Sequence, residues 1–216
     1  MTKTYAVIGL GRFGEVVARQ LAEMGREVLV IDQSEELVQK LSDTVTHAVV
    51  ADAKDISVLR SLGISDFDCV VVAIGSDVAS SIIITVQLKE LGVGKVVCKA
   101  GSEIHKQALL KVGADKVVIP EKEMGIKVAQ NLASGNVMDY IELSEDYSIM
   151  ELLAPVPWQG KSLRELNIRA RYDISVIAMR RGTKIIVSPG ADELVQAGDI
   201  LVALGGVDAL EALPEQ

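Results

Sequence analysis

Tyr5-Ala6-Val7-Ile8-Gly9-Leu10-Gly11-Arg12-Phe13-Gly14 joins a short apolar run to three spaced glycines. The run 5–8 is branched and apolar, as expected of a strand buried on both faces of a parallel sheet. Gly9 permits a tight turn after that strand, Gly11 allows a phosphate to approach the backbone, and Gly14 allows the following helix to pack closely. The stretch therefore predicts a nucleotide-binding turn, with the anion at a helix N-terminus.

The residues after this turn complete a strand–helix–strand unit. Apolar side chains recur at helical spacing over residues 13–24, Gly25 ends the helix, and residues 27–31 form a second strand. Asp32 follows at the position where a ribose hydroxyl would lie, and a carboxylate there repels a 2′-phosphate, which disfavours NADP. A glycine turn that only packs against the sheet would not require this acid.

Beyond Asp32, strands and helices continue to alternate. We expect helices over residues 34–42, 55–62, 78–91 and 103–112, and strands over 46–50, 68–74, 95–99 and 116–119. Six strands with helical crossovers predict an α/β fold, a Rossmann-like doubly wound parallel sheet. Aliphatic residues dominate the 49% hydrophobic content and aromatics make up only 3%, as suits such a sheet.

The pattern changes after residue 135. Pro120 ends the sixth strand, and a long amphipathic helix over 121–134 carries Met124, Val128 and Leu132 on one side. Short strands then follow over residues 139–143, 149–154, 174–179, 184–187 and 199–204, with helices only over 162–166 and 207–213. We therefore expect a domain over residues 1–135 that includes the long helix, and a small α+β domain over 136–216.

Composition argues against several classes of protein. The net charge of −8 disfavours nucleic acid, which needs a basic surface. The longest apolar runs fall short of the roughly 18 residues that a membrane span needs, and Thr2-Lys3-Thr4 leads into a strand without a signal peptide. Cys69 and Cys98 lack CxxC spacing, which indicates buried thiols in a reducing compartment, and we expect a cytoplasmic protein.

Ligands of a doubly wound sheet bind at the carboxyl ends of its strands. Asp52 could reach a base or ribose, or could cap the next helix; Gly75 could admit a ligand, or only form a turn; Lys99 could face phosphate, or only water. The nucleotide-binding residues that we predict are Gly9, Leu10, Gly11, Arg12, Phe13, Gly14, Asp32, Asp52, Ala53, Ile74, Gly75 and Lys99.

Catalytic residues are harder to find. His47 begins a predicted strand and His105 lies in a predicted helix, so neither stands at a strand end where hydride transfer would need an acid or base. The sequence also lacks a His and Cys metal cluster. We expect a protein that senses a nucleotide rather than an enzyme; the alternative is a small NAD(H)-dependent oxidoreductase whose catalytic residues the pattern does not reveal.

The glycine turn, the acid at 32 and four further motifs together resemble the RCK or KTN family, the regulatory subunits of bacterial Ktr and Trk potassium transporters. The further motifs are Ala73-Ile74-Gly75, Lys111-Val112-Gly113-Ala114-Asp115, Pro120-Glu121-Lys122-Glu123-Met124-Gly125 and Leu166-Asn167-Ile168-Arg169-Ala170-Arg171-Tyr172. The resemblance covers essentially the whole chain and predicts an RCK N-domain, a crossover helix and an RCK C-domain.

This resemblance implies a function and an assembly. ATP and ADP, with NADH as an alternative, would bind the N-domain and shift an octameric ring of dimers between conformations, the long helix being exchanged between dimer partners. The ring would dock beneath a membrane-embedded potassium-translocating subunit, so that the protein is peripheral to the inner face of the membrane without entering it. A ligand moves such a ring only through different affinities for its two states.

Two further sites also come from the resemblance. Arg12 would sense the γ-phosphate of ATP at the dimer interface, and Glu121 would help to hold a Mg or Ca ion between paired ATP molecules; otherwise Glu121 is a helix-terminal acid favoured by the helix dipole. Cyclic di-AMP would bind paired C-domains at Arg169, Ser175 and Ala191, although relatives often carry Asn and Pro at the last two positions. Alternatively, the arginines of this domain, at positions 164, 169, 171, 180 and 181, pair with Glu165 and Asp173.

Overall fold

A computed structural model describes residues 3–133, 137–144 and 146–213 of the chain. These residues form two compact units, Met1–Glu121 and Lys122–Gln216, each of which is described by itself. The boundary between the two units falls between Glu121 and Lys122, inside the long helix. The sequence pattern assigned that helix to the first domain and set the boundary after residue 135. The domain to which this helix belongs stays a prediction.

The first unit contains a six-stranded parallel sheet with the strand order β3-β2-β1-β4-β5-β6. Its strands are β1 (Thr4–Ile8), β2 (Glu27–Asp32), β3 (His47–Val50), β4 (Cys69–Val72), β5 (Val96–Lys99) and β6 (Lys116–Val118). The order reverses between β1 and β4, which is where ligands bind in such folds. The predicted doubly wound sheet is confirmed.

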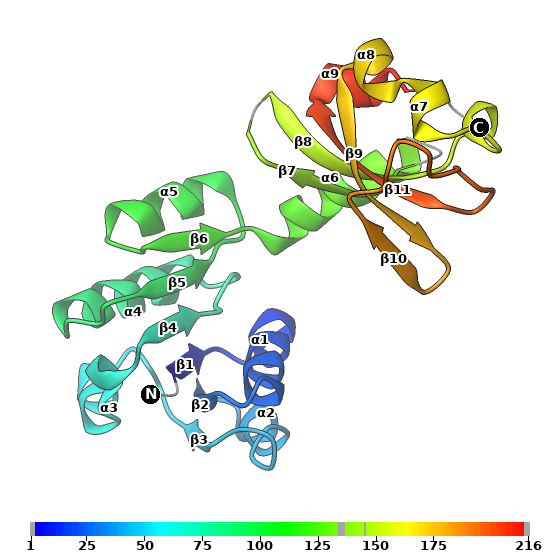
Figure 1. The fold of residues 1–216 in the computed structure, drawn as a ribbon. Helices are drawn as coiled ribbons and strands as arrows, with labels where there is room; N and C mark the ends of the chain where they lie inside the picture. The colour runs from blue at the N-terminus through cyan, green and yellow to red at the C-terminus, as the bar shows by residue number, and fades with distance from the viewer. Residues whose placement is uncertain (1–2, 134–136, 145, 214–216) are drawn as a thin grey trace. The chain divides into compact units, whose positions relative to one another are not determined.

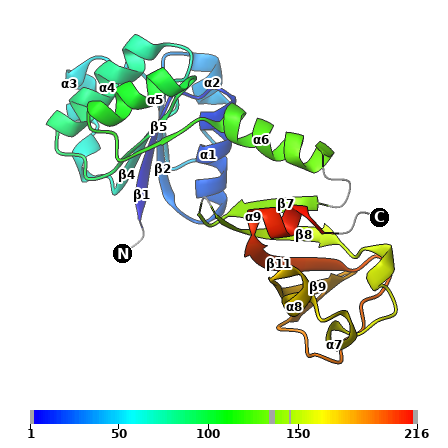
Figure 2. The same cartoon turned by 90° about the horizontal axis from the view of Figure 1, so that it is seen from above.

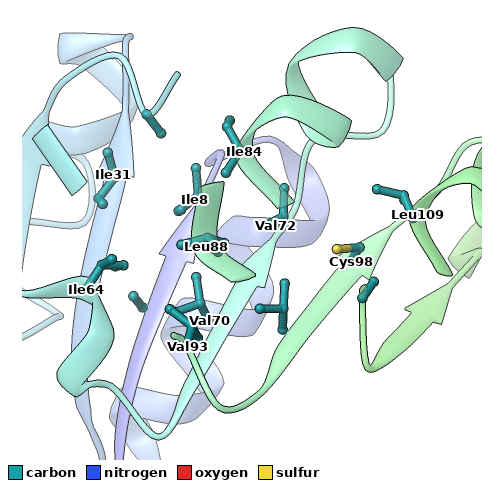
Figure 3. Packing of buried hydrophobic residues seen from close by; sticks show 14 of the residues in the cluster. Ile8, Ile31, Ile64, Val70, Val72, Ile84, Leu88, Val93, Cys98 and Leu109 are labelled. Atoms are coloured by element: carbon teal, nitrogen blue, oxygen red, sulfur yellow. The ribbon is translucent and has the colours of Figure 1, made fainter. Parts of the chain in front are cut away.

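Helices cover both faces of this sheet (Figure 1). They are α1 (Arg12–Glu23), α2 (Glu35–Gln39), α3 (Ile56–Ser61), α4 (Val78–Glu90) and α5 (Glu103–Lys111), with a 3-10 turn η1 (Ile64–Asp66). Successive residues of β1 point to opposite faces, so Val7 packs with α1 and α2, and Ile8 packs with α3, α4 and α5. Figure 3 shows the second of these cores, in which Ile8, Val72 and Leu88 are buried together.

The second unit contains a five-stranded antiparallel sheet in the order β10-β9-β11-β8-β7. Its strands are β7 (Val137–Glu142), β8 (Tyr147–Leu153), β9 (Ile174–Arg181), β10 (Lys184–Val187) and β11 (Ile200–Gly206) (Figure 1). Figure 2 shows β7, β8, β9 and β11 from a second direction. Its helices are α7 (Leu163–Leu166), α8 (Ile168–Tyr172) and α9 (Val207–Glu211), with a 3-10 turn η2 (Val156–Trp158). Trp158 is buried in this core, with its ring 5.7 Å from that of Tyr172.

The long helix α6 spans Pro120–Ala133. Its apolar residues Met124, Val128 and Leu132 are 61%, 49% and 81% exposed, so none of the described residues covers the side that the sequence marked as apolar. The predicted end at Ser134 and the stop at Gly135-Asn136 lie outside the described residues.

The observed elements correct the sequence expectation at one helix. Only residues 162–166 and 207–213 were expected to be helical in the second domain, but Ile168–Tyr172 is helical as well. Asn167 and Asp173 flank this helix at positive φ, 46° and 55°, a conformation that few residues other than glycine adopt. These two residues limit the helix to five residues, which is too short for its apolar side chains to show a helical period.

Candidate functional site

The glycine turn has the geometry that its sequence predicts. Gly9 lies at φ 91°, and a Cβ on Gly14 would lie 1.9 Å from the Gly9 carbonyl oxygen, so α1 can approach the turn only because residue 14 has no side chain. A Cβ on Gly11 would meet nothing within 4 Å, so the backbone there faces open space. Gly11 is the N-cap of α1, and no side chain caps the helix, which leaves its first amides available to an anion.

Asp32 ties this turn to the end of β2. Its Oδ2 accepts from the Leu10 amide at 2.6 Å and its Oδ1 accepts from the Ser34 amide at 2.8 Å. The carboxylate therefore has a structural role that the sequence did not reveal, in addition to the expected ribose contact. Leu10 itself is buried, so only its backbone belongs to the turn surface.

An open pocket of about 250 Å³ lies at the carboxyl ends of β1 to β4. Five of the predicted residues line it, and they are Gly9, Asp32, Asp52, Ala53 and Ile74. The other lining residues are Ile8, Ile31, Gln33, Ala51, Lys54, Asp77, Ser80 and Ile84. The apolar members provide walls for a flat ring, and the carboxylates provide acceptors for hydroxyl and amino groups.

Asp77 and Ser80 are site residues that the sequence reasoning missed. Asp77 is the N-cap of α4, where its Oδ1 accepts from the Ser80 amide at 3.0 Å and its Oδ2 accepts from the Ser80 hydroxyl. These bonds from Ser80 lower the pKa of Asp77. Because Asp77 follows Gly75 by two residues, the strand-end rule that selected Gly75 could also have found it.

The alternative role for Asp52, as a helix cap, is wrong. Asp55 caps α3 instead, since it accepts from the Ser57 amide at 2.8 Å. Asp52 accepts from the Lys54 amide at 2.9 Å and lies 3.6 Å from the Lys54 ammonium. Its carboxylate is 46% exposed and lines the pocket, so it remains a candidate for contact with a ligand.

Lys99 and Glu121 are joined in the structure. The Lys99 ammonium lies 2.6 Å from Glu121 Oε1 and 5.9 Å from the centroid of the Phe13 ring, and its stem packs on Gly75. The hydrogen bond from Lys99 lowers the pKa of Glu121. The alternative for Lys99, a lysine that only faces water, is wrong, because this side chain connects the glycine turn, the end of β4 and the start of α6.

Arg12 is the first residue of α1, and its side chain is exposed. No ion pair joins it to a carboxylate within the described ranges. An unpaired guanidinium beside uncapped helix amides is suited to a phosphate.

No cluster of three His, Cys, Asp or Glu side chains that could hold a metal ion exists among the described residues. Glu121 is 68% exposed and could give a hard cation one oxygen. That single carboxylate fits a cation whose other ligands are phosphate and water oxygens.

The arginines of the second unit do not pair with Glu165 or Asp173 among the described side chains. Arg164 pairs with Asp192 at 2.9 Å, and Arg180 pairs with Glu151 at 3.7 Å. Arg181 pairs with Asp199 at 2.8 Å and Glu193 at 3.2 Å, whereas Glu165 completes a capping box with Ser162.

The residues predicted for cyclic di-AMP lie on three different segments of the second unit. Arg169 is an exposed residue of α8 without an ion pair to a described acid, Ser175 is half-buried on β9, and Ala191 is exposed in the loop after β10. The role of these three residues stays a prediction.

Both histidines stand away from the pocket. His47 is the first residue of β3, at the amino ends of the strands and so at the opposite end of the sheet from the pocket, and it lines a second hollow with Glu27 and Phe67. His105 is buried in α5, where its Nδ1 accepts from the Gly101 amide at 3.3 Å and its Nε2 lies 2.6 Å from the Ser81 hydroxyl. Both ring nitrogens are thus occupied by structural contacts.

Comparison with known proteins gives matches along both units. Residues 5–120 match the TrkA-N domain and residues 148–215 match the TrkA-C domain. The Ktr system potassium uptake protein C of Bacillus subtilis (strain 168) is 45% identical over 207 residues, which cover 96% of this chain and 94% of that protein.

Solved structures support the same fold. A structure of the GsuK channel superimposes with a TM-score of 0.73 at 18% identity over 98% of this chain, which spans 39% of that channel chain. A crystal structure of the NAD(P)-binding domain of an exopolyphosphatase-related protein from Archaeoglobus fulgidus is 28% identical, with a TM-score of 0.53, over 60% of this chain and 96% of that one.

Proposed function

From the premise that this chain belongs to the family of TrkA-N and TrkA-C domain proteins of potassium uptake systems, we propose that it is an ATP- and ADP-sensing regulatory subunit of a potassium transporter. The family membership supports the expectation of a regulator and disfavours the alternative of a small oxidoreductase. Its partner in this proposal is a membrane-embedded potassium-translocating subunit.

One observation carries the nucleotide proposal: the site has two chemically different ends joined by the glycine turn. The pocket end holds the carboxylates of Asp32, Asp52 and Asp77, which accept from ribose hydroxyls and from an exocyclic amine. The other end holds the uncapped amides of α1 with Arg12 and Lys99, which bind phosphate oxygens. A nucleotide has two matching ends, because its base and ribose carry hydrogen-bond donors and its phosphates carry negative charge.

The cation proposal follows from Glu121 and the phosphate end. A divalent cation takes oxygen ligands, and one exposed carboxylate together with phosphates and water would supply them. ATP offers a γ-phosphate to Arg12 and to the cation, and ADP does not. In a pair of chains, this difference would hold the two nucleotide sites together with ATP and release them with ADP.

The exposed apolar side of α6 supports assembly with a second chain. Met124, Val128 and Leu132 follow each other at a spacing of four residues, and a partner helix would cover them. We extend this dimer to the octameric ring and place the ring at the cytoplasmic face of the membrane. No helix within the described residues is long and apolar enough to cross a bilayer.

A second ligand, cyclic di-AMP, is proposed for the second unit. Arg169 favours this proposal because it differs from Arg164, Arg180 and Arg181, each of which pairs with an acid. Equilibrium dialysis at micromolar cyclic di-AMP tests the proposal, with Arg169→Ala as the variant that should lose binding and Arg164→Ala as the control that should retain it. A wild-type protein that binds none removes the site.

The main proposal is tested by reconstitution. The chain and the membrane subunit of its own transporter are placed in proteoliposomes, and potassium flux is measured with ATP, ADP or NADH. We expect flux to differ between ATP and ADP. Equal flux with every nucleotide, or NADH oxidation by the chain alone, would count against a nucleotide-sensing regulator.

A further inference from the structure

Lys99 lies at the meeting point of three parts of the first unit. A Cβ on Gly75 would lie 3.1 Å from Lys99 Cε, so the stem of the lysine lies directly on the loop after β4. Its Nζ lies 5.9 Å from the centroid of the Phe13 ring at the start of α1, and 2.6 Å from Glu121 Oε1 at the start of α6. The ammonium therefore lies near a side chain of the first turn of α1, the helix whose uncapped N-terminus favours an anion.

The two side chains of this ion pair differ in how far they are exposed and hence in how freely they can move. The Lys99 side chain is 17% exposed and packs on Gly75, which limits the reach of its ammonium. The Glu121 side chain is 68% exposed, and its Oε1 accepts the hydrogen bond from the Lys99 ammonium. If a stronger anion comes to the ammonium, the carboxylate is the partner that can move away.

We propose that Glu121 is an internal stand-in for phosphate: it occupies the Lys99 ammonium, and a nucleotide phosphate displaces it. This inference rests on the proposed nucleotide function and adds the way in which the site is regulated. Binding breaks the Lys99–Glu121 pair, so the pair lowers phosphate affinity, and phosphate in turn releases Glu121 by the same factor. Because Glu121 directly precedes Lys122, where the second compact unit begins, the release occurs at the junction in the chain.

The test measures nucleotide binding by calorimetry in EDTA, so that no divalent cation contributes. Glu121→Gln should bind ADP about fivefold more tightly than the wild type. This is the change in affinity that corresponds to the largest usual contribution of an exposed ion pair. Adenosine, which has no phosphate, should bind both proteins equally. Lys99→Met should bind ADP more weakly, and adding Glu121→Gln to it should change the ADP affinity less than twofold.

The double variant Lys99→Met with Glu121→Gln distinguishes displacement of Glu121 from Lys99 by phosphate from simple repulsion between Glu121 and phosphate. If Glu121 acted only by repelling the phosphate, its removal would tighten ADP binding equally with and without Lys99, and the proposal would be overturned. An unchanged ADP affinity in Glu121→Gln, or a gain that adenosine shares, would overturn it as well.

Two controls complete the design. Lys89→Met removes a similar pair, since Lys89 lies 3.1 Å from Asp115 at the other end of the sheet, and it should leave ADP affinity unchanged. Lys99→Arg should restore the affinity lost in Lys99→Met, and thermal unfolding checks that each variant is folded. If the wild type binds no adenine nucleotide, the proposed function fails; if it binds ADP but Glu121→Gln does not tighten it, only the exchange fails.

Discussion

Asp32 combines two tasks in one side chain, because both of its oxygens already accept backbone N–H groups from Leu10 and Ser34. We predict that Asp32→Ala weakens adenine nucleotide binding by about 1–3 kcal/mol, the cost of leaving polar partners unpaired. Calorimetry measures the affinity. Asp32→Asn should also be impaired, since its amide nitrogen would face an N–H donor, and full affinity in the alanine variant would refute the assignment.

Gly14 and Gly11 form a matched pair of positions in the same turn. Gly14→Ala would place a methyl group 1.9 Å from the Gly9 carbonyl, so we expect a loss of stability of several kcal/mol. Gly11→Ala meets nothing within 4 Å, so the variant should fold normally but should exclude phosphate from the backbone. Thermal unfolding and ADP calorimetry distinguish the two effects, and a Gly11→Ala variant with wild-type affinity would contradict the phosphate position.

The sequence could predict the residues that act through the backbone, because glycine spacing after a strand has few structural solutions. It could not predict the Lys99–Glu121 pair, which joins residues 22 apart in the chain and depends on the register of β5 and β6. It also missed the hydrogen bonds that Asp32 accepts from the backbone amides of Leu10 and Ser34, because a carboxylate that binds ribose and one that binds amides look identical in a sequence.

Helices α4 and α5 are joined by a buried polar contact that makes the first unit sensitive to acid. Burial lowers the pKa of His105 below its ordinary value of 6.5, so the folded state favours the neutral ring. The unfolded chain takes up a proton as the pH falls through about 6.5, before the folded chain does. The stabilising contribution of the neutral ring is therefore complete above that pH and is lost as the pH falls through the lowered folded pKa.

We predict that the free energy of unfolding falls between pH 7.5 and 5.5 by up to about 1.4 kcal/mol per pH unit from this residue. His105→Gln cannot bind the proton, so it should lose less stability over the same range, although it starts lower at pH 7.5. Urea unfolding followed by circular dichroism measures both. Equal losses in the two proteins would show that other groups cause the acid sensitivity.

At the level of elements, the alternation of strands and helices predicted the first sheet, because short apolar runs that alternate regularly with segments of helical spacing are typical of a parallel sheet with helical crossovers. The same reasoning missed α8, whose five residues are too short to show a period. This helix is bounded by Asn167 and Asp173, which both have positive φ. A glycine in the sequence suggests a positive φ, whereas an Asn or Asp does not do so reliably.

For the assembled protein, we predict that divalent cations strengthen ATP binding but not ADP binding, and that Glu121→Gln abolishes this difference. In the proposed bridge, the γ-phosphate would supply the cation with oxygen ligands that ADP lacks. Calorimetry with and without Mg²⁺ tests this, and an equal cation dependence for both nucleotides would remove support for the bridge. In parallel, the mass in solution should be eight times the 23.1 kDa of one chain.

Trp158 gives the molecule an optical signal that belongs to one half of it. It is the single tryptophan of the chain, 3% exposed in the core of the second unit, so its fluorescence emission should shift to the red only when that unit unfolds. If ADP binds the first unit as proposed, ADP at 100 times its dissociation constant should stabilise that unit by about 2.7 kcal/mol. Any shift of the tryptophan melting curve caused by ADP therefore measures, without a label, how much of a signal received by one half of the chain reaches the other.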